Sequence, residues 1–332
     1  MTRFQAIRFR LLGPAFGLAR IAASVFLPPS VWRLRYGRPV RVRLPITVGW
    51  GQAVHPDVLL PEPPGSPFLL AFTPYPFQIR ELENPSVVSS ADGLRFHVER
   101  GGTNPLVPAP AVDHNDDPDI LLWNGSYCLV FLETVRPEHQ KLDLLQSTDR
   151  ISWTRKTVLT YRLAGDVPEP FIVSPALSSL GGTLFLHYVN TSARPNRIEY
   201  LTSSDIAEWD KTGPRAATFD HLTVEPWHVD VFRAGGRAYM LLCSVAASSS
   251  GRKEYDLFIA RSEDMKSWTL SRRPIFERRP FGTRVLYRSS GFVRNGDLFV
   301  YFSYESPLQA WWIGVVRLRL ADFFPQPGLA AE

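Results

Sequence analysis

Short apolar runs separated by glycine- and asparagine-containing turns fill the chain from about residue 50 to 320. Helical periodicity is almost absent after residue 45, and 29 prolines and 22 glycines would interrupt helices while separating short strands well. A turn such as Asn124-Gly125 or Gly235-Gly236 between two apolar runs is typical of a β-hairpin. The pattern therefore predicts an all-β protein.

A sequence repeat accompanies this pattern. The motif Ser-x-Asp-x-x-x-(Trp/Phe) occurs four times, and its aspartates are 57, 56 and 59 residues apart. An aspartate in such a turn can accept hydrogen bonds from nearby backbone N–H groups, while the aromatic residue enters the core. We therefore expect structural roles for these aspartates. The four copies are Ser90/Asp92/Phe96, Ser147/Asp149/Trp153, Ser203/Asp205/Trp209 and Ser262/Asp264/Trp268.

Aligning the apolar runs reveals a fifth repeat that lacks the turn motif. Four antiparallel strands in about 57 residues form one propeller blade, so we predict a five-bladed β-propeller with four antiparallel strands per blade. A parallel β-helix or two β-sandwiches would not explain this period. The fifth repeat has no room for a fourth strand, and the alternating run Val40 to Val48 is the best candidate to supply it. The five opening strands are predicted at 55–59, 117–121, 174–177, 228–232 and 288–292.

Charge is distributed unevenly along the chain. The net charge is +5, but the first 56 residues hold nine arginines and no acidic residue, which leaves 28 basic against 32 acidic residues afterwards. Nucleic-acid binding by the propeller is therefore not expected. We expect a basic N-terminal arm at 1–45, the propeller at 46–322, a C-terminal tail at 323–332, and a monomer.

The apolar segment from Leu11 to Leu27 has a basic flank, as a signal peptide has, but Pro14 and Arg20 interrupt it. Three interpretations of this segment stay open: a signal for secretion, an amphipathic helix that lies on the propeller or on an anionic membrane, and a plain surface arm.

Cys128 and Cys243 lie two blades apart, so no disulfide between them is expected. Buried free thiols favour a cytoplasmic location over a secreted one.

The opening strands also carry the candidate site. Alternate residues of a strand point to the same side, and nine of the ten residues at the first and third positions are polar. Around one axis they would form a polar pocket for carbohydrate hydroxyls and for acid–base chemistry, or a wet channel without activity. The chain has no tight ligand spacing such as His-x-x-x-His, so no metal and no cofactor are expected. The ten residues are His55, Asp57, Asp117, Asp119, Ser174, Ala176, His228, Asp230, Arg288 and Ser290.

The five repeats, the segments His55-Pro56-Asp57 and Asp117-Pro118-Asp119, and the Ser-x-Asp turns together resemble the five-bladed propeller glycoside hydrolases of families 43, 32, 62 and 68. The resemblance implies an aspartate as general base or nucleophile, a second that orients the substrate, and a glutamate as general acid. Asp57 matches the first role, and Asp117 or Asp119 the second.

The family glutamate has no counterpart. Its expected positions hold Ser174-Pro175-Ala176 and Trp227-His228-Val229-Asp230, and neither Glu169 nor Glu225 aligns with it. Either Asp230 replaces the acid with help from His228, or the protein binds sugar without cleaving it. Nearby Asp57 and Asp119 should raise the pKa of Asp230. Arg288 would either clamp an anionic substrate group or neutralise the aspartates.

The resulting hypothesis is a glycoside hydrolase-like protein that cleaves an oligo- or polysaccharide in bacterial glycan metabolism. A catalytically inactive carbohydrate-binding propeller and a protein-interaction scaffold are the alternatives. The tryptophans Trp123, Trp227, Trp311 and Trp312 are candidate stacking platforms for sugar rings. The predicted catalytic residues are Asp57, Asp119 and Asp230, and the predicted substrate-binding residues are His55, Asp117, Ser174, Trp227, His228, Tyr287, Arg288 and Ser290.

Overall fold

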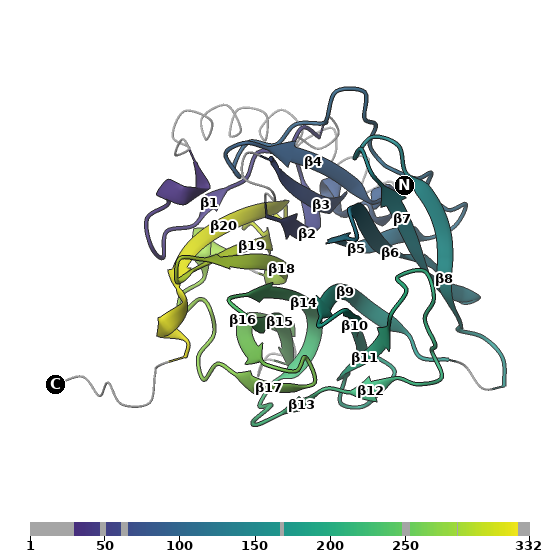
Figure 1. Ribbon diagram of the computed structural model, residues 1–332. Coiled ribbons are helices and arrows are strands. Elements are labelled where there is room, and N and C mark those ends of the chain that lie inside the picture. The colour runs from purple at the N-terminus through teal and green to yellow at the C-terminus, as the bar shows by residue number, and fades with distance from the viewer. Residues whose placement is uncertain are drawn as a thin grey trace.

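The computed structural model describes residues 30–46, 51–60, 66–166, 169–247, 253–283 and 285–324. Within them, five β-sheets surround a common axis (Figure 1). The innermost strands β2, β5, β9, β14 and β18 contact one another in ring order, and β18 returns to β2. The predicted five-bladed propeller is thereby confirmed.

The strands follow the axis-to-rim order of a propeller blade. The first blade contains β2 (Ala53–Leu59), β3 (Phe68–Pro74) and β4 (Ser86–Ser90). The second contains β5 (His114–Trp123), β6 (Ser126–Val135), β7 (His139–Ser147) and β8 (Thr154–Arg162). The third contains β9 (Ile172–Leu180), β10 (Thr183–Asn190), β11 (Arg197–Ser203) and β12 (Arg215–Ala216). The fourth contains β14 (Glu225–Ala234), β15 (Arg237–Ala247), β16 (Lys253–Ser262) and β17 (Ser267–Leu270), to which β13 (Thr218–Phe219) adds in parallel.

The fifth blade closes the ring with a strand from the other end of the chain. It contains β18 (Val285–Arg294), β19 (Asp297–Glu305), β20 (Trp311–Arg319) and β1 (Val40–Arg41). Val40 pairs with Val315 and Arg41 with Gly314, which confirms the predicted closing strand. Residues 47 and 48 of the predicted run lie outside the described residues. Short 3-10 helices complete the fold: η1 (Val31–Arg33), η3 (Pro76–Gln78), η4 (Arg80–Leu82), η5 (Pro280–Gly282) and η6 (Leu320–Asp322).

The first blade departs from the predicted four strands. Its fourth strand is reduced to a single bridge between Ser89 and His97. The segment after the Asp92 turn instead bonds to the arm, because Arg43 N donates to the Leu94 carbonyl at 2.8 Å and Phe96 N to the Arg43 carbonyl at 3.0 Å. The arm thus pairs with the outer side of this reduced fourth strand, whose other side bridges β4.

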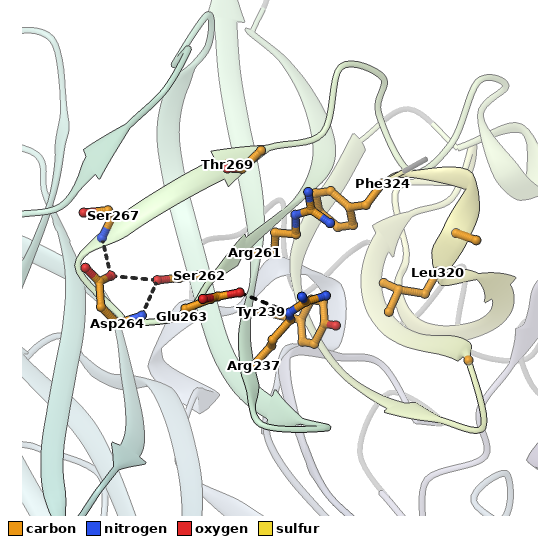
Figure 2. Close-up of a pocket in the computed structure, with 12 residues that line it drawn as sticks. Arg237, Tyr239, Arg261, Ser262, Glu263, Asp264, Ser267, Thr269, Leu320 and Phe324 are labelled. Carbon is orange, nitrogen blue, oxygen red and sulfur yellow. Dashed lines mark hydrogen bonds and ion pairs between the residues drawn. The ribbon is translucent and has the colours of Figure 1, made fainter. Parts of the chain in front are cut away.

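The Ser-x-Asp turns have the predicted capping role. Asp264 Oδ1 accepts hydrogen bonds from the N–H groups of Lys266 and Ser267, each at 2.8 Å, and from Ser262 Oγ at 3.0 Å; Figure 2 shows the Ser262 and Ser267 bonds. The following Trp268 is only 2% exposed. Asp92, Asp149 and Asp205 also accept backbone N–H bonds within their own turns.

Apolar side chains fill the spaces between the blades. Cys128 and Cys243 are buried and free, so the expectation of no disulfide is confirmed. Val31, Leu34, Val42 and Leu44 of the arm join the core between the fifth and first blades. No helix in the described ranges has the length and apolar character needed to cross a bilayer.

Each innermost strand starts a few residues before its predicted position and contains a break in register near its first polar position. In the first three blades a residue with positive φ precedes a proline: His55 (53°), Asp117 (50°) and Ser174 (57°). Proline lacks the N–H that a ladder needs, so a bulge on an edge strand accommodates it. The bulge helps place the first and third polar positions at two different levels of the axis.

Candidate functional site

Two levels of polar side chains occupy the propeller axis. His55, Asp117 and His228 form the upper cluster, and Asp57, Asp119 and Asp230 form the lower cluster. Within each cluster, one nitrogen or oxygen atom from every residue lies within 4.8 Å of the others. All six side chains are buried. The structure thus brings together, in these two clusters, six of the ten residues that the strand alignment selected.

The lower level contributes to a ring of side-chain-to-backbone hydrogen bonds. Each innermost strand is the edge of its sheet, so its free N–H groups need acceptors. In every case an axial side chain of the preceding blade supplies an acceptor oxygen for one of these N–H groups. The axial side chains that do so therefore have a structural role. The ring consists of Ile120 N to Asp57, Leu177 N to Asp119 (2.8 Å), Val229 N to Ser174 Oγ (3.0 Å), Gly291 N to Asp230 (3.2 Å) and Val58 N to Ser290 Oγ (2.9 Å).

Arg288 lies between the two levels and is completely buried. Its guanidinium donates to Asp117 Oδ1 at 3.0 Å, to Asp119 Oδ2 at 3.5 Å and to the Pro175 carbonyl at 3.1 Å. This arrangement fits the interpretation that Arg288 neutralises the aspartates. Because of the break in register in β18, Tyr287 lines the upper pocket where Arg288 was expected.

The lower cluster borders a cavity of about 340 Å³, whose walls combine apolar side chains with Ser178, Ser179 and Arg233. Burial raises the pKa of Asp230 well above its usual range, and the charge of Asp57 adds to the effect. Burial, Asp57 and Asp230 likewise raise the pKa of Asp119. The predicted direction for Asp230 therefore holds, with burial as the leading cause. Both oxygens of Asp57 already accept hydrogen bonds, from Ile120 N and from Ser290 Oγ, and the catalytic role of the three aspartates stays a prediction.

The upper cluster lies in a separate pocket of about 450 Å³. Of the predicted site residues, His55, Asp117, Trp227, His228 and Tyr287 line it, together with the candidate platform Trp311. Ser174 and Arg288 are buried in the axis, and Ser290 borders the lower cavity. Trp123 and Trp312 instead pack with the apolar cores. Lining residues that the sequence analysis missed are Val54, Tyr75, Arg80, Glu83, His114, Asp116, Arg136, Phe171, Val173, Tyr255 and Val285.

The upper cluster has the donor set of a metal site. Asp117 Oδ1 lies 3.6 Å from both His55 Nε2 and His228 Nδ1. Both ring nitrogens of His228 lack a hydrogen-bond partner in the described structure, although the side chain is only 3% exposed. Two imidazoles and a carboxylate are ligands that zinc and similar divalent ions prefer. The expectation of no metal ligands rested on spacing along the chain, whereas these residues come from three blades.

The protonation states also suit a cation. Burial lowers the pKa of His228 to about 3 and lowers that of His55, so both imidazoles are neutral at pH 7 and have a free lone pair. Burial alone would raise the pKa of Asp117, but the neighbouring His55, His228 and Arg288 hold it below its usual range. The far nitrogen of His55, Nδ1, lies 3.0 Å from Thr73 Oγ1, which orients the ring as outer partners of metal-binding histidines do.

Glu83 and His114 extend the site on the side of the first two blades. Glu83 Oε2 lies 3.5 Å from His55 Nδ1, and burial followed by the charge of Asp116 raises the pKa of Glu83 well above its usual range. His114 contacts Asp113 at 2.5 Å and Asp116 at 2.9 Å. Although burial would lower the pKa of His114, these aspartates and Glu83 raise it to about 9. The pocket therefore holds a buried carboxyl group beside a charged imidazolium.

Aromatic side chains form part of the wall of the upper pocket. Trp227 Nε1 donates to Tyr287 Oη at 3.2 Å, and the Tyr287 ring lies 4.3 Å from His228 and 5.4 Å from Trp311. Tyr75 continues the wall beside Trp311. Aromatic faces with a few polar groups are typical of pockets that bind small organic ligands.

A further cavity of about 720 Å³ lies away from the axis, between the fourth blade and η6 (Figure 2). Arg237, Arg261 and the Ser262–Asp264 turn line it, and Glu263 pairs with Arg237 at 3.5 Å. None of the axial residues borders it, so its size alone does not make it the reaction site.

The comparisons with known proteins agree with this architecture. The sequence matches no protein-family profile. Over 80 residues it is 38% identical to an A type blood N-acetyl-alpha-D-galactosamine deacetylase of Flavonifractor plautii, and this match covers 23% of the chain but only 10% of that protein.

Solved structures match over far more of the chain. An N-acetylgalactosamine deacetylase from F. plautii, in complex with blood group B trisaccharide, has a TM-score of 0.71 at 18% identity and covers 89% of this chain and 99% of its own. A thermostable family-43 glycoside hydrolase has a TM-score of 0.59 at 17% identity, over 88% of this chain and 100% of its own. A Cellvibrio cellulosa α-L-arabinanase complexed with arabinohexaose has a TM-score of 0.58 at 11% identity, over 80% and 91%. The chain therefore has the five-bladed propeller fold of the family-43 glycoside hydrolases, a fold that the F. plautii deacetylase also has.

Proposed function

We propose that this protein is a carbohydrate-active hydrolase that removes an acyl group from an N-acetylated sugar with the help of a divalent metal ion. His55, Asp117 and His228 would hold the ion. The observation that carries the proposal is the convergence of these three side chains in a pocket with an aromatic wall, where neither nitrogen of His228 has a hydrogen-bond partner among the described residues. The similarity to an N-acetylgalactosamine deacetylase supports the same activity.

Amide hydrolysis requires a polarised carbonyl group and an activated water molecule, and a bound divalent ion supplies both. The water oxygen bonds to the acyl carbon, the C–N bond breaks, and the amine leaves with a proton. Glu83 lies beside His55, and in its ionised form it can take the proton from water. Its raised pKa favours keeping that proton until it passes to the amine. Trp227, Tyr287 and Trp311 would hold the sugar ring against these groups.

The test uses the purified full chain and a panel of N-acetylated oligosaccharides, with acetate and reducing sugar measured separately. We expect acetate release that stops after chelation and returns with Zn²⁺ or Mn²⁺. His228→Gln should lose both bound metal, measured by elemental analysis, and acetate release, and Glu83→Gln should lose turnover while it keeps the metal. His139→Gln changes a histidine outside the pocket and is the matched control. Acetate release that withstands both chelation and His228→Gln would refute the metal site.

Cleavage of a glycosidic bond by the lower cluster is the second candidate. It is favoured by three carboxyl groups within 4.8 Å that border their own cavity, and by the fold shared with family-43 enzymes. This activity predicts release of reducing sugar that survives chelation and is lost in Asp57→Asn and Asp230→Asn. Sugar binding without release of either product would instead support the carbohydrate-binding propeller.

A further inference from the structure

Exposed arginines lie on the arm and at the ends of β18 and β20 in the fifth blade. Across the described ranges, none of the five has a carboxylate within the 4.0 Å of an ion pair, and all are exposed. We call this surface the arginine strip. It consists of Arg33, Arg35, Arg38, Arg294 and Arg319.

Two aromatic residues of the arm contact two arginines of the strip. The Arg294 guanidinium lies 4.3 Å from the ring of Trp32, and that of Arg319 lies 4.9 Å from the ring of Tyr36. Asp297 contacts this surface but is already occupied by Arg317 and by the Tyr36 hydroxyl. Among the described residues, no ion pair therefore neutralises the five charges of the strip.

The sequence before the strip has the same character. Residues 1–29 contain four more arginines, no acidic residue and the apolar stretch from Leu11 to Leu27. Clustered arginines next to an apolar stretch are typical of segments that bind anionic lipid headgroups, whereas nucleic-acid binding does not call for the apolar part. Tyr36, which is 45% exposed within the strip, is a side chain that favours the membrane–water interface.

We infer that the arginine strip docks the propeller on an anionic phospholipid surface. The direction of β18 supports an orientation in which the arginine strip faces the membrane and the upper pocket faces away from it. Arg294 ends this strand, whereas Val285 and Tyr287 near its start line the upper pocket. A membrane at the Arg294 end would leave the mouth of the pocket accessible to a carbohydrate. The inference does not depend on the reaction proposed above.

Vesicle co-sedimentation of the full chain tests this inference, with phosphatidylcholine vesicles with and without phosphatidylglycerol. We expect binding that requires phosphatidylglycerol and weakens with added salt. Each arginine near an anionic surface strengthens binding about fivefold, so Arg35→Ser/Arg38→Ser/Arg319→Ser should weaken it about 100-fold, and Arg38→Ser alone about fivefold. The matched control is Arg162→Ser/Arg197→Ser/Arg215→Ser, which removes three exposed arginines from the second and third blades and should bind like wild type.

Three results would overturn the inference. The first is unchanged binding by both strip variants. The second is an equal loss in the control, because net charge rather than the strip would then explain binding. The third is tighter binding to double-stranded DNA than to the anionic vesicles, which would assign the strip to nucleic acid. The single variant keeps the test valid if the triple variant unfolds.

Discussion

The folded protein should lose stability in mild acid because of His187, a residue remote from the proposed site. This histidine of β10 is completely buried, and its Nε2 donates to the Met265 carbonyl at 2.8 Å. Its Nδ1 has no hydrogen-bond partner in the described structure. Burial lowers the pKa of His187 from 6.5 to about 4, although the bond to Met265 opposes the shift. The imidazole is therefore neutral in the folded state at pH 7.

The size of the effect follows from the two pKa values. The pKa of His187 is lower in the folded state than in the unfolded chain, so between pH 6.5 and 4 the unfolded chain takes up a proton that the folded state does not. The free energy of unfolding is therefore highest, as far as His187 is concerned, above pH 6.5 and decreases as the pH falls towards 4. The difference of about 2.5 between the two pKa values corresponds to about 3 kcal/mol of unfolding free energy, of which about 2 kcal/mol is lost by pH 5.

Urea unfolding at pH 7.5 and pH 5.0, for wild type and His187→Gln, measures this contribution. The glutamine Nε2 can still donate to Met265, so the substitution removes the titration while keeping a donor. Between the two pH values, wild type should lose about 2 kcal/mol more unfolding free energy than the variant, since the other titrating groups are the same in both proteins. Equal pH dependence of wild type and His187→Gln would show that His187 does not cause this loss of unfolding free energy.

Three further predictions concern the propeller scaffold and are checked by thermal melting. Asp264→Ala removes the turn cap and should cost about 1 kcal/mol without changing turnover per folded molecule, so a selective loss of turnover would contradict its structural role. Gly291→Ala would place a Cβ 2.5 Å from the Phe299 carbonyl oxygen and should destabilise by more than about 1 kcal/mol, whereas Gly213→Ala, whose nearest neighbour lies 3.9 Å away, should not. Deletion of residues 1–48 removes the closing strand and should lower the melting temperature markedly, and an unchanged value would refute ring closure by β1.

Local interactions explain what the sequence by itself determined. The repeat period, the hairpin turns and the capping aspartates each depend on residues close together in the chain, and so five blades could be counted without a structure. The missing fourth strand of the last blade followed from the same count. Strand alternation also placed His55, Asp117 and His228 on the axis, because alternate residues of a strand face the same side.

Tertiary structure decided how these axial residues divide into clusters. A bulge in each innermost strand separates the upper cluster from the lower one, and in β18 it exchanges Tyr287 for Arg288 at the pocket wall. Glu83 lies on a loop between strands, where no alternation marks its direction. The approach of His228 to Asp117 joins residues 111 positions apart. Closure of the ring sets this distance, because the packing of all five blades against one another determines where each innermost strand lies.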